Sequence, residues 1–319
     1  MEIAVSHRDK NRTISSKGFT LTRLAFIKHM AEAGQGFAPR AEKLLRTLGM
    51  LLHFSYYLQR GSFYSNNCFS LPPNHLYDPT EQGQFSNLAG KAIADFLSKR
   101  IDNSLFTVGY EAAMKLMKIP IKENRPDLIA FPNQSSYIAI EAKGYTVSNV
   151  TDERMSGHKK QAQSGPIKCV GYCVACVSYN LYGHNGVQCK YYDPPNDNFK
   201  DDGGFLKKEL SKDYYSGLLS FLDYFGHEKK EYGKEKFYEI QFSDFKKTPA
   251  FFHEELFELE QYRFCFRRLR LILPGDIHKF AEEGISDDLK PFIFESTKEE
   301  KDLNRNLYID YDRVGLRYE

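Results

Sequence analysis

Three ionisable residues stand among apolar residues in the first half of the chain. Asp127 follows a proline and opens the segment DLIAF, while Glu141 and Lys143 lie two residues apart in YIAIEAKG. Alternate residues of a strand share a face, so Glu141 and Lys143 should point the same way, with Ala142 opposite. The intervening PNQSS has the residues of a turn, which predicts a hairpin that brings Asp127 beside all three.

Such a cluster of charges on an apolar hairpin is costly unless another group compensates for the lost water. Two adjacent carboxylates repel each other, and a divalent cation removes that repulsion. Mg²⁺ prefers oxygen ligands, commonly one or two carboxylates with waters and a substrate phosphate. A nearby lysine can orient or deprotonate the attacking water, or neutralise charge on the phosphate. The pattern predicts a phosphodiester hydrolase that uses Mg²⁺, with Mn²⁺ as a substitute; an ordinary salt bridge at a sheet edge is the alternative.

At these residues the chain resembles the PD-(D/E)xK nuclease superfamily, which has the restriction-endonuclease-like fold. The matching residues are Pro126 and Asp127, followed by Glu141, Ala142 and Lys143. The resemblance implies a four-stranded mixed sheet flanked by helices, dependence on Mg²⁺, and cleavage of DNA or, less often, RNA. It also implies that Asp127, Glu141 and the backbone carbonyl of Ala142 bind the metal. Lys143 would then act on the water nucleophile.

The helices on either side of the hairpin match the family less well. Many members carry an acid on the helix before the first strand, whereas the segment 85–101 has Lys91 at the expected place and Asp95 as its only acid. The stretch 152–165 is predicted to be a helix that ends at a glycine and a proline. Its residue Gln161 is expected to reach the active site and to complete the catalytic set.

The wider pattern predicts an α/β fold of the α+β kind, with a central mixed sheet flanked by helices. Apolar residues recur every three or four positions over 21–34 and 39–61, which indicates helices. Residues 1–18 are polar and are expected to be held loosely, and 66–83 has the composition of a loop. Helix, strands, helix and two further strands then follow over 85–193, the order expected of a restriction-endonuclease-like core.

Three regions are predicted from these patterns. A helical N-terminal region packed on the core spans 1–84, and the nuclease core spans 85–193. Residues 194–319 form an insertion and a C-terminal extension, or a small second domain. Within them, 194–236 is rich in Pro, Asn, Asp, Gly and Lys and is interpreted as an insertion or linker.

The overall composition gives little information about partners. The chain has 319 residues, and its 44 basic and 42 acidic residues give a net charge of only +2. The first residues lack the apolar run of a signal peptide, and no stretch approaches the roughly 18 apolar residues of a membrane helix. These features predict a soluble cytoplasmic protein that does not associate with a membrane.

The cysteines suggest a second chemistry that their surroundings argue against. Cys169, Cys173 and Cys176 have the C-x3-C-x2-C spacing of some iron–sulfur loops, but their neighbours are apolar and β-branched. On a strand Cys169 and Cys173 share one face and Cys176 takes the other, so the thiolates cannot converge on an iron–sulfur cluster or on zinc. We interpret them as buried structural cysteines.

The function expected from these patterns is that of an Mg²⁺-dependent endonuclease that hydrolyses phosphodiester bonds of DNA. By resemblance, such a protein serves restriction or antiviral defence, where a partner protein of the defence system is possible. Cutting both strands calls for two active sites, which predicts a homodimer or larger assembly. The alternative is a catalytically inactive subunit on a nuclease fold that binds nucleic acid or serves as a scaffold in a larger complex.

Overall fold

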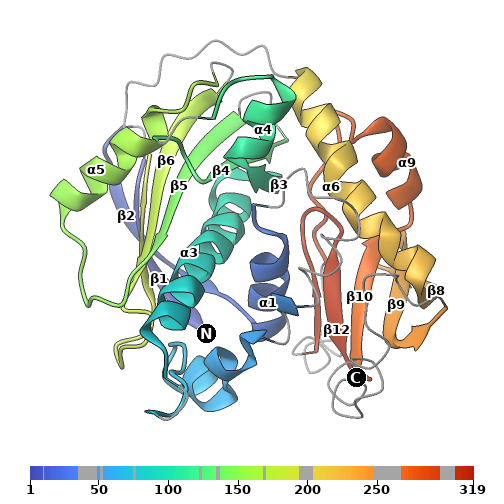
Figure 1. Cartoon of the computed structure of the whole chain (residues 1–319), viewed down its shortest axis with the longest axis horizontal. Coiled ribbons are helices and arrows are strands. Elements are labelled where there is room, and N and C mark those ends of the chain that lie inside the picture. Colours follow the sequence, from blue (N-terminus) through green and yellow to red (C-terminus); the bar gives the residue numbers. More distant parts are fainter. Residues whose placement is uncertain are drawn as a thin grey trace.

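The computed structural model of the chain describes residues 1–9, 11–34, 49–50, 53–74, 77–121, 124–133, 137–167, 170–193, 204–246, 267–294 and 306–319 (Figure 1). The described residues form a mixed α/β fold with two sheets. A seven-stranded mixed sheet is flanked by helices, and a five-stranded sheet from the C-terminal part of the chain lies beside it. The first sheet confirms the predicted central mixed sheet between helices.

The first sheet contains two parallel pairs of neighbours in an otherwise antiparallel arrangement. Its strands are β1 (Glu2–Arg8), β2 (Ile14–Thr20), β3 (Ser104–Gly109), β4 (Leu128–Pro132), β5 (Tyr137–Gly144), β6 (Val170–Tyr179) and β7 (Gln188–Tyr192). Their order across the sheet is β2-β1-β7-β6-β5-β4-β3, with β1–β7 and β5–β6 parallel. The sheet is therefore wider than the four-stranded one implied by the resemblance.

Helices cover both faces of this sheet. They are α1 (Arg23–Glu32), α3 (Pro79–Asp102), α4 (Tyr110–Leu116) and α5 (Asp152–Gln163), with the short helices η1 (Ser55–Leu58) and η2 (Gly61–Ser65). Ile138 and Ile140 of β5 share an apolar cluster with α1 and α3, whereas Tyr137 and Ala139 share one with α4 and α5. Because side chains alternate along a strand, Glu141 lies on the face of α4 and α5.

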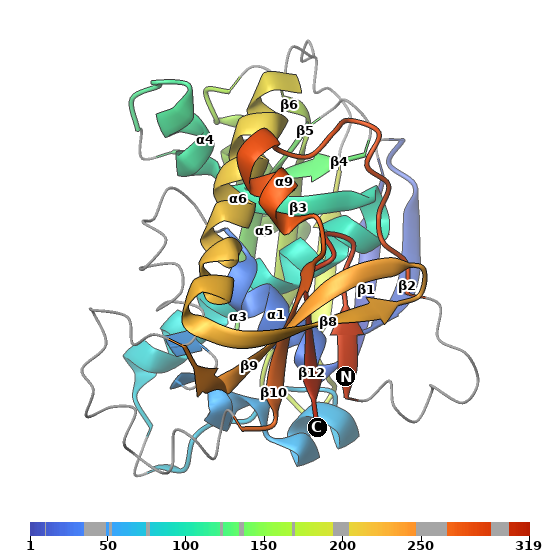
Figure 2. The same ribbon diagram turned by 90° about the vertical axis from the view of Figure 1, so that its right-hand side faces the viewer.

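The second sheet is antiparallel throughout and shares a core with the first. It comprises β8 (Phe225–Tyr232), β9 (Glu235–Phe245), β10 (Leu269–Pro274), β11 (Leu307–Ile309) and β12 (Gly315–Tyr318), in the order β11-β12-β10-β9-β8. Helices α6 (Gly204–Tyr224) and α9 (Ile277–Glu283) pack against each other beside it (Figure 2). Tyr214 of α6 belongs to one continuous apolar cluster with Phe106 of β3 and Leu271 of β10. The two sheets are therefore joined through α6.

The N-terminus is ordered, contrary to the expectation that residues 1–18 are held loosely. In β1, Ile3 and Val5 are buried while Glu2 and Ala4 are exposed, which is the period of a half-buried strand. The strand runs parallel to β7, so it extends the core sheet. The region 1–84 is therefore not wholly helical. Its alternating apolar stretch is short and is followed by polar residues, so composition alone concealed it.

The linker expected over 194–236 is also wrong for the residues that the structure describes there. Residues 204–232 form the 21-residue helix α6 and the strand β8. Leu210, Leu218 and Phe221 of α6 are buried in the cluster that joins the sheets. Their spacing is helical, but the surrounding Lys, Asp and Gly residues dominate the composition and led to the wrong interpretation.

The helix predicted over 85–101 exists but begins earlier. It starts at Pro79, where the Asp78 side chain accepts a hydrogen bond from the Thr80 backbone N–H and so caps the helix. Proline fits the first turn because its missing N–H would have no partner there. The loop predicted over 66–83 therefore ends before Pro79.

The described cysteines behave as predicted. Cys173, Cys176 and Cys189 are buried and form no disulfide among the described residues, and the sulfur atoms of Cys176 and Cys189 lie 3.6 Å apart. Cys173 lies in the apolar cluster on the face of α4 and α5, and Cys176 lies in the cluster on the face of α3. Cys169 lies outside the described residues, as do the turn residues 134–136.

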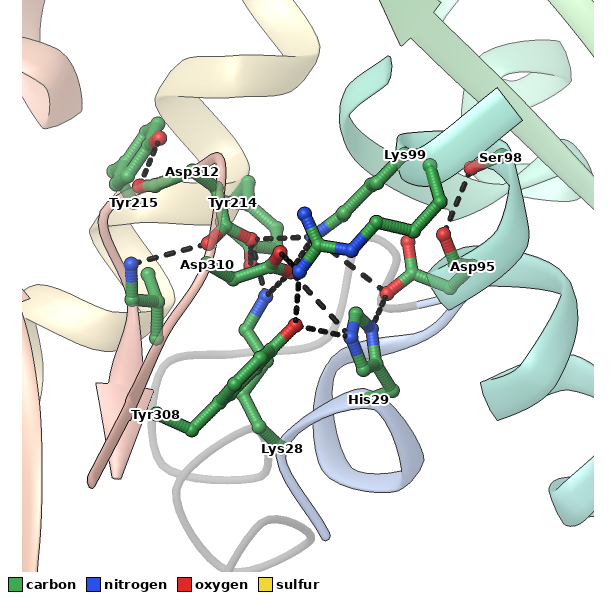
Figure 3. Close-up of polar contacts among 12 residues, drawn as sticks. Lys28, His29, Asp95, Ser98, Lys99, Tyr214, Tyr215, Tyr308, Asp310 and Asp312 are labelled. Carbon is green, nitrogen blue, oxygen red and sulfur yellow. Dashed lines mark hydrogen bonds and ion pairs between the residues drawn. The ribbon is translucent and has the colours of Figure 1, made fainter. Parts of the chain in front are cut away.

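Charged side chains join α1 and α3 to the C-terminal strands inside the protein. Lys28 Nζ lies 3.0 Å from Asp310 Oδ2 and 2.5 Å from Asp312 Oδ2, and Lys99 Nζ lies 2.6 and 2.9 Å from the same atoms (Figure 3). All four side chains are at most 1% exposed. Two buried ammonium groups are thus balanced by two buried carboxylates, which is the arrangement that buried charges require.

A histidine and a third carboxylate extend this network. His29 Nδ1 lies 2.6 Å from Asp95 Oδ2, and its Nε2 lies 2.8 Å from the Tyr308 hydroxyl (Figure 3). Burial lowers the pKa of His29. Burial alone would raise the pKa of Asp95, but Lys99 and His29 lower it to about 2. Asp95, the acid of the predicted helix 85–101, therefore has a structural role between α1 and α3.

Within the described part of the chain, no helix combines the length and apolar character required to cross a membrane.

Candidate active site

The β4–β5 hairpin brings Asp127 and Glu141 together as the sequence predicts. The two strands are antiparallel and pair Leu128 with Ile140. Continuing this register by one residue places Asp127 opposite Glu141. The Asp127 N–H donates a 3.0 Å hydrogen bond to the Ile140 carbonyl, which holds Asp127 beside this end of β5. Directly opposed residues have neighbouring side chains on one face of the sheet.

Lys143 bridges the two carboxylates. Its Nζ lies 3.2 Å from Asp127 Oδ2 and 2.5 Å from Glu141 Oε1. The Lys143 side chain is 25% exposed and that of Asp127 is 19% exposed, so solvent reaches part of both side chains. Burial alone would lower the pKa of Lys143, but Asp127 and Glu141 raise it. The ammonium form is therefore favoured, and it donates hydrogen bonds.

Glu141 is the most constrained member of the site. Its side chain is fully buried, and neither carboxylate oxygen accepts a hydrogen bond of acceptable geometry from the described residues, although Lys143 is close. Burial, together with the nearby Asp127, raises the pKa of Glu141 to about 7. A buried carboxylate that lacks donors has unused capacity for a cation.

The backbone at Ala142 faces the same place. Its N–H donates a 3.1 Å hydrogen bond to Asp127 Oδ2. The N–H and carbonyl of one strand residue point toward the same neighbouring strand, so the Ala142 carbonyl also faces the side of Asp127. The Ala142 side chain is buried with the residues of the α3 face, opposite to Glu141 and Lys143, as predicted.

A pocket of about 380 Å³ opens beside these residues and is largely polar. Gln161 of α5 lines it, and its Nε2 donates a 3.4 Å hydrogen bond to the Arg125 carbonyl. The expectation that Gln161 reaches the site is consistent with this position. The pocket is also lined by Asp127, Lys91, Lys115, Arg125 and Glu111.

Three basic residues of this pocket were not predicted to belong to the site. Lys91 Nζ lies 3.2 Å from Asp127 Oδ1, Arg125 pairs with Glu111, and Lys115 comes from the last turn of α4. In the sequence, Lys91 is distinguished only by standing where the resemblance implies an acid. Arg125 immediately precedes Pro126 in the sequence, which was the available signal for it. No local sequence pattern marks Lys115, because only the packing of α4 in the folded protein brings it to the pocket.

His158 of α5 lies near the cluster as well. Its Nε2 is 2.9 Å from the Tyr145 hydroxyl. Burial lowers the pKa of His158, and the positive charge of Lys143 lowers it further. The imidazole is therefore neutral at pH 7, and it adds a polar but uncharged group to this side of the hairpin.

The oxygen atoms of the site suit a hard divalent cation. Asp127 and Glu141 supply two carboxylates, and the Ala142 carbonyl, on the side of Asp127, can supply a third oxygen ligand. Mg²⁺ is usually held by one or two carboxylates and completes its shell with waters and phosphate oxygens. The described residues contain no group of three or more His, Cys, Asp and Glu side chains that could hold a metal ion. The donor set therefore fits Mg²⁺ better than zinc, which prefers histidine and cysteine.

Comparisons with known proteins identify no relative. No family model matches the chain, and neither does any curated protein or solved structure. The chemistry of the site must therefore be inferred from its own residues.

Proposed function

We propose that this chain is an Mg²⁺-dependent nuclease that hydrolyses phosphodiester bonds, with DNA as its substrate, on a restriction-endonuclease-like core. The observation that carries the proposal is the group formed by Asp127, Glu141 and Lys143. Two opposed carboxylates and one ammonium group share one face at the end of a hairpin. The Lys143 Nζ atom lies within 3.2 Å of an oxygen of each carboxylate.

Each residue of the site has a proposed role that follows from its position. Asp127, Glu141 and the Ala142 carbonyl hold the cation, which when bound supplies Lewis-acid stabilisation of charge on the phosphate. Lys143 donates hydrogen bonds, so it orients the attacking water and neutralises charge on the phosphate oxygens. Gln161 positions the Arg125 backbone and lines the pocket that receives the substrate.

A nucleic-acid substrate is supported by the charges that line two pockets of the described residues. The active-site pocket has three basic residues, Lys91, Lys115 and Arg125, against the acids Glu111 and Asp127. A second pocket of about 560 Å³ lies on the C-terminal sheet. Its lining includes five basic residues and two acids, namely Lys229, Lys234, Lys236, Lys279, Arg313, Glu235 and Asp276. Basic surfaces of this kind bind the phosphate backbone regardless of sequence.

The proposal is tested by incubating the purified chain with supercoiled plasmid, linear duplex, single-stranded DNA and RNA. Each substrate is offered with Mg²⁺, with Mn²⁺ and with EDTA. Cleavage that needs the metal and is lost in Asp127→Asn and Lys143→Met supports the proposal. Asp223→Asn, which changes an exposed acid of α6, serves as the control. Undiminished cleavage by Asp127→Asn would contradict the role proposed for this site.

An inactive nuclease-fold subunit is the second candidate, and one observation favours it. Both carboxylate oxygens of Asp127 are held by ammonium groups, Oδ1 by Lys91 and Oδ2 by Lys143. If these contacts persist with DNA, the chain binds nucleic acid without turnover. Salt-dependent DNA binding together with an absence of cleavage under every metal condition would select this candidate.

The biological setting belongs to the same proposal. We propose a role in restriction or antiviral defence, with a partner protein of the defence system. This part rests only on the resemblance of the motif to the nuclease superfamily. A homodimer is proposed because cleavage of both strands requires two sites. Sedimentation analysis with and without duplex DNA measures the assembly directly.

A further inference from the structure

Helix α3 approaches the end of β5 closely enough to place one of its residues in the active site. A Cβ atom on Gly90 would lie 2.5 Å from both the Gly144 backbone nitrogen and the Lys143 carbonyl carbon. A Cβ atom on Gly144 would lie 1.9 Å from the Ser86 carbonyl oxygen. Only two glycines permit this backbone contact. The contact fixes the next residue, Lys91, beside the strand that carries Glu141 and Lys143.

Lys91 uses this position to reach the metal-binding carboxylate. Its Nζ lies 3.2 Å from Asp127 Oδ1, and the Lys91 side chain is 36% exposed. An exposed ion pair of this kind contributes little to stability. The fold therefore does not explain the lysine, whereas a place in the pocket beside Asp127 gives its ammonium group direct access to a bound phosphate.

The charges of the cluster indicate how many cations it can hold. Asp127 and Glu141 carry two negative charges when ionised, and Lys91 and Lys143 carry two positive ones. One divalent cation has these two carboxylates as ligands. A second would need further ligands, yet the described residues contain no group of three His, Cys, Asp or Glu side chains placed to hold a metal ion, and Glu111, which lines the pocket, pairs with Arg125. It would also be repelled by Lys91, which stands on the open side of Asp127.

We propose that Lys91 is a catalytic residue of this site, and that its ammonium group contacts the substrate phosphate in the place of a second divalent cation. The inference rests on the proposed nuclease function. When one cation binds at Asp127, the ammonium group of Lys91 leaves Oδ1 and pairs with a phosphate oxygen. The phosphate charge is then neutralised by one cation, Lys143 and Lys91 together.

Two variants of Lys91 separate this role from a structural one. Lys91→Met removes the charge at similar length, and Lys91→Glu supplies a third carboxylate. Lys160→Met is the matched control, because Lys160 is an exposed lysine of α5 that does not line the pocket. Thermal unfolding monitored by circular dichroism establishes that all three remain folded.

The first readout does not depend on activity. Titration with Mn²⁺ followed by electron paramagnetic resonance is expected to give one bound ion per chain for the unmodified protein, Lys91→Met and Lys160→Met. Lys91→Glu is expected to bind two. A stoichiometry of two in the unmodified protein overturns the inference, because the lysine then replaces no cation.

The second readout is the cleavage rate at saturating Mg²⁺. Lys91→Met is expected to lower kcat by about 100-fold or more, as does the loss of one charge-stabilising donor in other enzymes, while Lys160→Met cleaves normally. Cleavage by Lys91→Met at the normal rate refutes the inference and leaves the nuclease proposal intact. If the unmodified protein binds no Mn²⁺ and cleaves nothing, the nuclease proposal itself fails.

Discussion

Replacing Asp310 by asparagine removes one of the two carboxylates that balance Lys28 and Lys99 in the interior. The amide keeps the shape of the side chain, so packing is preserved. Asp310 Oδ2 lies 3.0 Å from Lys28 Nζ and 2.6 Å from Lys99 Nζ, and all three side chains are at most 1% exposed. In the variant, Lys28 and Lys99 share Asp312, and Lys99 also keeps Asp95 Oδ2 at 3.7 Å, so the buried network has one negative charge fewer.

The expected cost of this change is about 3–5 kcal/mol, the range found when one partner of a buried ion pair is removed. That is a large fraction of the ~5–15 kcal/mol by which most domains are stable. The double variant Asp310→Asn with Lys28→Met restores the balance of charge. It is expected to be more stable than the sum of the single losses predicts, by at least about 1 kcal/mol.

Urea unfolding at pH 7, followed by far-ultraviolet circular dichroism, measures these differences. Asp223→Asn is the control, because Asp223 is exposed on α6 and its change should fall within about 0.5 kcal/mol. Lys28 and Lys99 hold the pKa of Asp310 well below its ordinary value of 3.8 against the effect of burial. The advantage of the unmodified protein should therefore be complete above pH 4 and decline as the pH falls below it. A loss below about 1 kcal/mol at pH 7 would refute the reasoning.

Three further predictions follow from the site and its surroundings. Glu141→Gln should stabilise the metal-free protein by about 3 kcal/mol at pH 8 in urea unfolding, because the rise of the Glu141 pKa from 4.5 to about 7 costs ~1.4 kcal/mol per pH unit. The gain should vanish near pH 4, where the carboxyl is protonated in both states; a gain independent of pH contradicts the cause. Gly90→Ala should lower stability by about 1–3 kcal/mol and reduce cleavage, whereas Gly83→Ala, on the same helix with open space around it, should be neutral or stabilising in thermal melts. Unchanged stability of Gly90→Ala would mean that α3 can shift. In DNA-binding titrations, the magnitude of the slope of log affinity against log salt concentration should fall by about 3 to 4 when four lysines of the second pocket are changed to glutamine, namely Lys229, Lys234, Lys236 and Lys279. An unchanged slope would exclude this surface from DNA binding.

Local patterns predicted the hairpin because its information is contained in a short stretch. The period of two over YIAIEAKG, the turn residues before it and the proline before Asp127 together specify which side chains share a face. The same kind of signal located α5 and β6. It failed for residues 1–18 and 194–236, where short apolar patterns lie among many polar residues and composition outweighed periodicity.

The active site is only partly local. Asp127, Glu141 and Lys143 lie within one hairpin, so the sequence alone brought them together. Lys91 reaches Asp127 because Gly90 packs on Gly144. No sequence pattern within α3 predicts this contact. From the sequence alone, a lysine at that position is expected to be an ordinary exposed helix residue. Its place in the site becomes evident only from the packing of α3 on β5.

The sequence by itself determined the β4–β5 hairpin and its two acids and one lysine, because side-chain direction along paired strands depends on neighbours a few residues apart. Tertiary structure alone decided the rest of the site and the joining of the two sheets. Lys28 meets Asp310 across 282 residues, and their pairing depends on how α1 and the C-terminal strands pack. Such contacts arise from the burial of whole elements against one another, and a local pattern contains no record of them.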